Sequence, residues 1–214
     1  MAVRSLTVCL RAFQREVHLL ASLFESQTNS VGTQGFWTSP PRFAAQSYSI
    51  VRLHDSWARF CRTLILTSAT GNVSTLSGSH VTRSPAVASG QSSLDALKAT
   101  YTRNQRRRVL WEPRWYEPTD AIEAAGRLQV HNFSAISAAL GAMGTGVGEL
   151  GDCRHFLAHR SELSNNRVDV IRARLGLPSS ASVQEIANSL VPGGVRLYEF
   201  WWQELLLRAN AAAA

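Results

Sequence analysis

Residues 3–24 read VRSLTVCLRAFQREVHLLASLF, and this stretch decides the fold. Large apolar side chains recur through it at alternating spacings of three and four residues, at Val3, Leu6, Leu10, Phe13, Val17, Leu20 and Phe24. That spacing places them on one face of an α-helix, as an a/d-type seam. We therefore expect a long amphipathic N-terminal helix that packs within a helical bundle.

A second segment repeats the same spacing. Its apolar positions are Ile50, Leu53, Trp57, Phe60 and Leu64. We expect this second long helix to reach about Ala69 and to stop at Gly71. Pro40 and Pro41 precede it, and because proline disrupts a helix interior we expect them to lie outside the helix.

The next part of the chain is poor in large apolar residues. Residues from about 71 to 93 are rich in Ser, Thr and Gly and predict a flexible loop. A third helix should follow, capped by Ser92 or Ser93. It leads into the basic stretch Arg103–Arg108.

Shorter helices are expected toward the C-terminus. Asp120 and Glu123 have the spacing of a capping box and predict one helix whose apolar residues continue to Met143. No convincing strand pattern appears. We predict an all-α fold, a single bundle over residues 1–210 with two long N-terminal helices, short C-terminal helices and a tail at 211–214.

The amino-acid composition limits the classes of binding partner that we expect. The 214 residues are 45% hydrophobic, enough for a core, and contain no apolar run of membrane-spanning length, so no membrane partner is expected. The formal net charge is +7, and 21 of the 22 basic side chains are arginine, Lys98 being the exception. A positive net charge favours a nucleic-acid partner, because it attracts phosphate groups.

The cysteines and histidines do not predict a metal site. Cys9, Cys61 and Cys153 are sparse, odd in number and not at ligand spacing. An odd, scattered set is typical of a reducing compartment, and we expect a cytoplasmic protein. We expect no metal and no cofactor.

The densest chemistry lies in residues 151–160, GDCRHFLAHR. We expect them on a helix that begins after Gly146, with Glu149 in its first turn, and that ends by residues 164–166. His155 and His159 are four residues apart and share a face of such a helix. Arg154 lies at the edge of that face, where a guanidinium beside two imidazoles suits a phosphodiester.

Arg154-His155-Phe156-Leu157-Ala158-His159 resembles the signature of the HEPN family, the prokaryotic and eukaryotic nucleotide-binding helical domains. That signature is an arginine, a polar residue, a few mostly apolar residues and a histidine, late in a helical bundle. The resemblance covers about ten residues by sequence and most of the chain by the order of its expected helices.

The resemblance implies a metal-independent endoribonuclease that leaves 2′,3′-cyclic phosphate ends, with a site formed by two HEPN domains. Arg154, His159 and His155 would be its catalytic residues. The expected partners are RNA, a second HEPN domain in a homodimer or a HEPN–HEPN heterodimer, and a neutralising or sensor protein. Stand-alone members of the family cluster in prokaryotic defence and toxin systems, so the resemblance also implies a role as an effector or toxin in such a system.

Other arginines are candidates for RNA binding. Arg160 follows the motif directly, and Arg106, Arg107 and Arg108 form a basic cluster upstream. Two other interpretations stay open: a non-catalytic HEPN-like module for dimerisation or nucleotide binding in a larger assembly, and a plain helical scaffold. The complete Arg154/His159 pair favours the enzyme.

Overall fold

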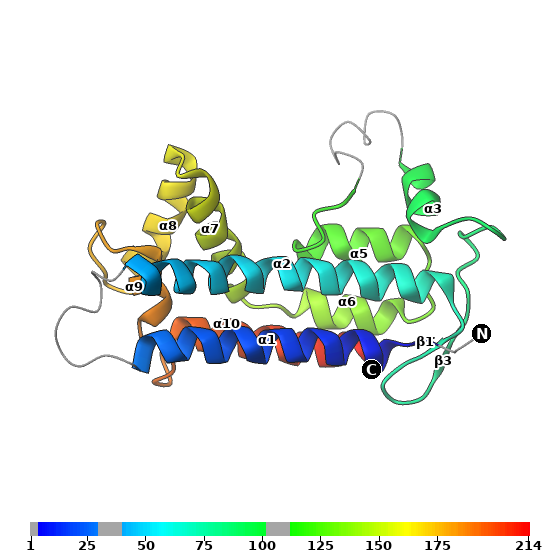
Figure 1. Cartoon of the computed structure of the whole chain (residues 1–214). Coiled ribbons are helices and arrows are strands. Elements are labelled where there is room, and N and C mark those ends of the chain that lie inside the picture. Colours follow the sequence, from blue (N-terminus) through cyan, green and yellow to red (C-terminus); the bar gives the residue numbers. More distant parts are fainter. Residues whose placement is uncertain (1–3, 30–39, 102–111) are drawn as a thin grey trace. The chain divides into compact units, whose positions relative to one another are not determined.

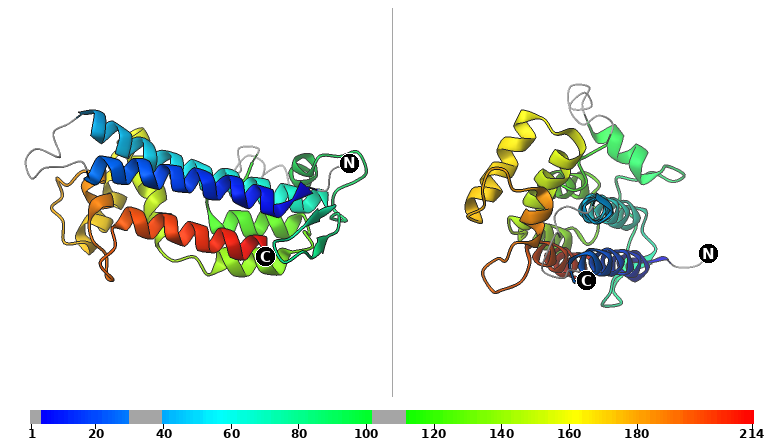
Figure 2. Two further views of the ribbon diagram at one scale, coloured as in Figure 1. Left: turned by 60° about the horizontal axis from the view of Figure 1, so that its bottom comes forward. Right: turned by 60° about the vertical axis from the view of Figure 1, so that its left-hand side comes forward.

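A computed structural model describes residues 4–29, 40–101 and 112–214 of the chain. Within these ranges about 69% of the structure is helical, which confirms the predicted all-α class (Figures 1 and 2). The predicted RNA-binding residues Arg106, Arg107 and Arg108 lie outside the described residues.

The helices form two compact units. Unit 1 comprises Met1–Gln14, Trp57–Met143 and Leu206–Ala214, and unit 2 comprises Arg15–Ser56 and Gly144–Leu205. Three long helices contribute residues to both units: α1 (Leu6–Asn29), α2 (Pro40–Thr70) and α10 (Leu197–Ala213).

The apolar seams of α1 and α2 are buried as their spacing predicts. The seam residues Leu6, Leu10, Phe13, Val17, Leu20, Phe24, Ile50, Leu53, Trp57, Phe60 and Leu64 are all buried. In unit 1 the Phe13 ring stacks on Phe60 with centroids 4.8 Å apart. In unit 2 Phe24 stacks on Tyr198 with centroids 3.9 Å apart. Aromatic packing of this kind adds to the free energy gained by burial.

The start of α2 differs from the prediction. Pro40 and Pro41 form its first turn instead of lying outside the helix. Proline lacks an N–H group, but the first N–H groups of a helix have no intrahelical acceptor, so proline is tolerated there.

Unit 1 also contains a small sheet that the sequence did not predict. Its strands β1 (Arg4–Ser5), β2 (Val73–Ser74) and β3 (His80–Val81) are ordered β1-β2-β3. β1 is parallel to β2, with Arg4 opposite Val73, and β2 is antiparallel to β3. Strands of two residues are too short to show an alternating pattern, and two of them lie in the stretch predicted as a loop.

The remaining helices of unit 1 are α3 (Ser93–Thr100), α5 (Pro118–Arg127) and α6 (Phe133–Gly141). Ser92 caps α3 by accepting a hydrogen bond from the Asp95 N–H, which confirms one of the two predicted caps. The predicted continuous helix to Met143 is instead interrupted after α5. Gln129 there adopts a left-handed φ of 50°, a conformation that ends helices.

The predicted capping box of α5 is also not formed. The helix starts earlier, at Pro118, and Glu117 makes no side-chain cap. The Asp120 carboxylate instead accepts a hydrogen bond from the Arg114 Nε at 2.9 Å. At the other end of the chain, the predicted tail at 211–214 belongs to α10 up to Ala213, whose carbonyl accepts the Leu76 N–H at 2.8 Å.

Unit 2 contains α7 (Gly146–His159), α8 (Glu162–Arg174) and α9 (Val183–Asn188), together with its parts of α1, α2 and α10. All the described candidate residues of the motif lie in this unit. α7 and α8 follow one another closely in the chain and form a helical hairpin (Figure 1).

Candidate functional site

The motif helix α7 begins against α10. The Gly144 N–H donates to the Glu204 Oε1 at 2.5 Å, so a buried carboxylate from α10 satisfies a backbone donor at the start of α7. A Cβ on Gly146 would overlap the other Glu204 oxygen, so any larger residue there would force the Glu204 side chain to shift. Glu149 lies in the first turn, as predicted, where a negative charge complements the helix dipole.

The end of α7 is earlier than the sequence suggests. The helix stops at His159, and Arg160 adopts a left-handed conformation with φ 44° while its N–H donates to the Phe156 carbonyl at 3.0 Å. Ser161 then caps α8. Arg160 is therefore an exposed C-terminal cap of α7, and not a member of the helical face that carries the histidines.

His155 and His159 lie side by side near this end. Their ring centroids are 4.9 Å apart and both side chains are exposed. Partial desolvation, followed by the positive charges of His159 and Arg154, lowers the pKa of His155. A lowered pKa keeps this imidazole neutral at physiological pH, the state in which it accepts a proton.

Arg154 points to a different side of α7. Its Nε lies 3.6 Å from the Asp55 Oδ1 on α2, and the side chain is 29% exposed. It lies five positions before His159, which corresponds to about 140° around a helix of 3.6 residues per turn. A single α7 therefore does not present Arg154 and His159 on one face.

The partner of Arg154 is one that sequence reasoning missed. Asp55 follows His54 on α2, and the His54 side chain is buried with 4% of the residue exposed. The His54 Nδ1 lies 3.5 Å from the same Asp55 Oδ1 that faces Arg154. One carboxylate oxygen thus lies close to both an imidazole and a guanidinium.

Gly151 of α7 faces the His54 ring, and a Cβ there would make an ordinary van der Waals contact with it. A Cβ at Gly151 would lie 3.6 Å from the His54 Nε2, so the glycine position faces the ring directly. Burial, with smaller contributions from Arg154 and His155, lowers the pKa of His54 to about 4. The adjacent pair His54-Asp55 beside the buried seam residue Leu53 was the one available signal in the sequence.

A second ion pair ties α7 to α8. The Arg167 Nη1 lies 3.3 Å from the Asp152 Oδ1, and the arginine side chain is 55% exposed. Arg167 contributes to the lowered pKa of His155, so it belongs to the same electrostatic environment. With Arg160, it adds exposed positive charge near the histidine pair.

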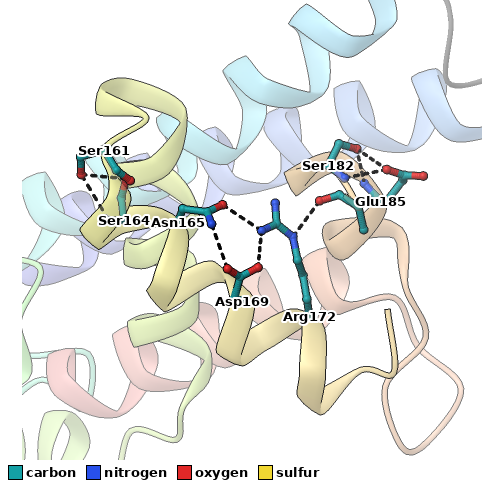
Figure 3. A network of polar contacts seen from close by, with 8 residues as sticks. Ser161, Ser164, Asn165, Asp169, Arg172, Ser182 and Glu185 are labelled. Atoms are coloured by element: carbon teal, nitrogen blue, oxygen red, sulfur yellow. Dashed lines mark hydrogen bonds and ion pairs between the residues drawn. The ribbon is translucent and has the colours of Figure 1, made fainter. Parts of the chain in front are cut away.

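The α8–α9 region supports α7 through a buried arginine (Figure 3). Arg172 donates from Nε to the Ala181 carbonyl at 2.8 Å and from Nη1 to Asp169 at 2.7 Å and Asn165 at 3.0 Å. Its guanidinium carbon also lies 5.6 Å from the ring centroid of Phe156 on α7. Beyond the linking segment, Ser182 and Glu185 form a complete capping box at the start of α9.

The described ranges contain neither a metal-binding cluster nor a membrane-spanning helix. Among residues 4–29, 40–101 and 112–214, no group of three or more His, Cys, Asp or Glu side chains is placed to hold a metal ion. In the same part of the chain no helix is both long enough and apolar enough to cross a membrane.

Comparisons with protein-family models, with curated proteins and with solved structures give no significant match. The fold and the site define the class: an all-α protein with a pair of exposed histidines on one helix and an arginine–aspartate pair between that helix and a long neighbour.

Proposed function

We propose that this chain is a metal-independent endoribonuclease that acts as a dimer. The observation that carries the proposal is the pair of exposed imidazoles on α7, whose ring centroids are 4.9 Å apart, on the same helix as Arg154. The resemblance of residues 154–159 to the HEPN signature supports the same chemistry. It also suggests a role as an effector or toxin in a prokaryotic defence system.

RNA supplies its own nucleophile, the 2′-hydroxyl. A neutral imidazole accepts the proton of the 2′-hydroxyl as its oxygen attacks the phosphorus. A protonated imidazole donates a proton to the departing 5′-oxygen. His159 and His155 supply these two groups, and the products carry a 2′,3′-cyclic phosphate and a 5′-hydroxyl.

The proposed role of Arg154 is to stabilise the transition state. Its guanidinium would donate hydrogen bonds to the non-bridging phosphate oxygens, where negative charge increases during attack. Because Arg154 and His159 lie about 140° apart on one helix, the proposal needs a second copy of α7 opposite the first. Each composite site would then combine the arginine of one protomer with the histidine of its partner.

A second function is favoured by one contact. The 3.6 Å pair between Arg154 and Asp55 already gives the guanidinium an acidic partner within the chain. In a non-catalytic HEPN-like module for dimerisation or nucleotide binding, that pair would be structural.

A cytoplasmic location agrees with the buried thiols of Cys61 and Cys153, which form no disulfide.

The test is cleavage of end-labelled RNA by the purified protein in excess EDTA. Wild type should cleave it and leave 2′,3′-cyclic phosphate ends. His159→Ala and Arg154→Ala should each lose on the order of 10²-fold or more in rate. Arg154→Lys should rescue poorly, because a point charge does not reproduce the planar fork of arginine.

The matched controls are His80→Ala and Arg15→Ala, which remove exposed side chains of the same types elsewhere in the chain. They should cleave like wild type. Because His159 is exposed, its replacement should leave thermal unfolding within about 0.5 kcal/mol of wild type. Cleavage that requires a divalent metal, products with 5′-phosphates, or an active His159→Ala variant would refute the proposed mechanism.

A further inference from the structure

We propose that Asp55 is a positioning residue for Arg154, held in place by the buried imidazole of His54. The inference rests on the proposed function for its catalytic consequence. The contacts involved lie between α2 and α7 within unit 2, and both Asp55 and His54 are outside the motif.

One carboxylate oxygen of Asp55 lies close to both Arg154 and His54. Asp55 Oδ1 lies 3.6 Å from Arg154 Nε and 3.5 Å from His54 Nδ1. An Asp carboxylate on a helix surface normally rotates freely in water, and exposed pairs of this kind contribute little. Here the neighbouring ring is buried, so one side of the carboxylate is bounded by a fixed group and its rotation is restricted.

The charge state of His54 determines whether it competes with Arg154 for Asp55. The ring lies under α7 at Gly151 and its pKa is lowered to about 4, chiefly by burial. It is therefore neutral at physiological pH and does not compete with Arg154 for the negative charge of Asp55. A charged imidazole at this place would repel the guanidinium.

Asp55 faces the Nε edge of the Arg154 guanidinium. The Arg154 atom nearest Asp55 is Nε, which is buried, whereas 29% of the side chain remains exposed. A contact through Nε leaves the two terminal nitrogens of the guanidinium available to a phosphate, in the bidentate geometry that arginine favours. Asp55 thus orients Arg154 without occupying the atoms that would bind substrate.

The experiment follows the Arg154 Nε–H resonance by NMR in protein labelled with ¹⁵N-arginine, assigned by its loss in Arg154→Lys. In wild type, the restricted Nε–H should exchange slowly with water. Asp55→Asn keeps the shape and removes the charge, so it should shift this resonance and speed its exchange. Asp55→Glu should restore it in part.

The matched control is Glu16→Gln, which removes the acidic partner of Arg52, another arginine pair involving α2, with Nη2 2.7 Å from Oε1. It should leave the Arg154 resonance unchanged. Identical Arg154 resonances in wild type and Asp55→Asn would overturn the inference, and this outcome does not depend on any ribonuclease activity.

The activity measurement is separate. Asp55→Asn should lower kcat on a short RNA by about 10- to 100-fold while KM changes little, as expected when a catalytic group is displaced by a small distance. If wild type cleaves RNA and Asp55→Asn matches its kcat, the positioning role is refuted. If wild type cleaves no RNA at all, the proposed function fails and the NMR result still decides whether Asp55 orients Arg154.

Discussion

At the scale of single residues, the buried imidazole of His54 couples the site to pH. Its pKa is lowered to about 4 by burial, against an ordinary value of 6.5. Between these two values the unfolded chain binds a proton at this position and the folded protein does not. The free energy of unfolding contributed by His54 is therefore fully present above pH 6.5 and is lost as the pH falls toward 4.

This difference predicts a pH slope of stability. The free energy of unfolding in urea should fall between pH 7 and pH 4, and His54 should account for roughly 3 kcal/mol of the change. His54→Gln should flatten the slope over this interval, whereas His80→Gln, at an exposed site on β3, should leave it as in wild type. Parallel slopes in wild type and His54→Gln would contradict the assignment.

At the scale of elements, Arg172 of α8 anchors the segment that leads into α9, through the Ala181 carbonyl. Only 5% of this residue is exposed, and its hydrogen bonds to Asp169, Asn165 and the Ala181 carbonyl satisfy a guanidinium that would otherwise be buried without partners. Burial of a charge is tolerated only when such partners are present. We therefore expect Arg172 to stabilise the segment between α8 and α9.

Arg172→Met keeps much of the apolar stem and removes the hydrogen-bonding group. It should lower the free energy of unfolding by about 1.5–3 kcal/mol, the range for hydrogen bonds to charged groups. Arg167→Met on the same helix removes an exposed arginine and should cost within about 0.5 kcal/mol. Urea unfolding monitored by circular dichroism compares the two, and equal midpoints would show that Arg172 does not stabilise the segment between the two helices.

At the scale of the whole molecule, the proposed site is shared between two protomers. If each site takes Arg154 from one protomer and His159 from its partner, inactive single variants should complement each other. Mixing Arg154→Ala with His159→Ala protein should recover roughly a quarter of wild-type activity, since half the dimers are mixed and each has one intact site.

The control mixes Arg154→Ala with the double variant Arg154→Ala/His159→Ala, which can form no complete site and should stay inactive. Sedimentation at micromolar concentration should show a dimer in every mixture. Complete inactivity of the complementing mixture, despite dimers, would mean that the residues act within one protomer. A monomer in sedimentation would remove the basis for a shared site.

The features that could be predicted are those that depend on neighbours in the chain. The seams of α1 and α2 follow from a spacing of three and four residues, and their described members are buried. The Ser92 cap follows from a hydroxyl placed just before a helix. The approach of His155 to His159 follows from a separation of four residues on one helix.

The sequence pattern predicted helix boundaries less reliably, because the same residue type can favour more than one local structure. Pro40 indicates a break inside a helix but is favourable at its start, and only the observed boundary decides between the two. The interruption between α5 and α6 occurs at Gln129, a residue that gives no turn signal in the sequence. Likewise Arg160 caps α7 where glycine would be the usual residue.

What the sequence by itself determined is the all-α class, the buried faces of the long helices and the histidine pair, because each is set by helix geometry within a few residues. Only the tertiary structure decided which side chains from distant segments meet. Asp55 approaches Arg154, and Glu204 receives the Gly144 N–H across 60 residues of chain, because α2 and α10 pack beside α7. Such contacts depend on how helices pack in space, and spacing along one helix carries no information about them.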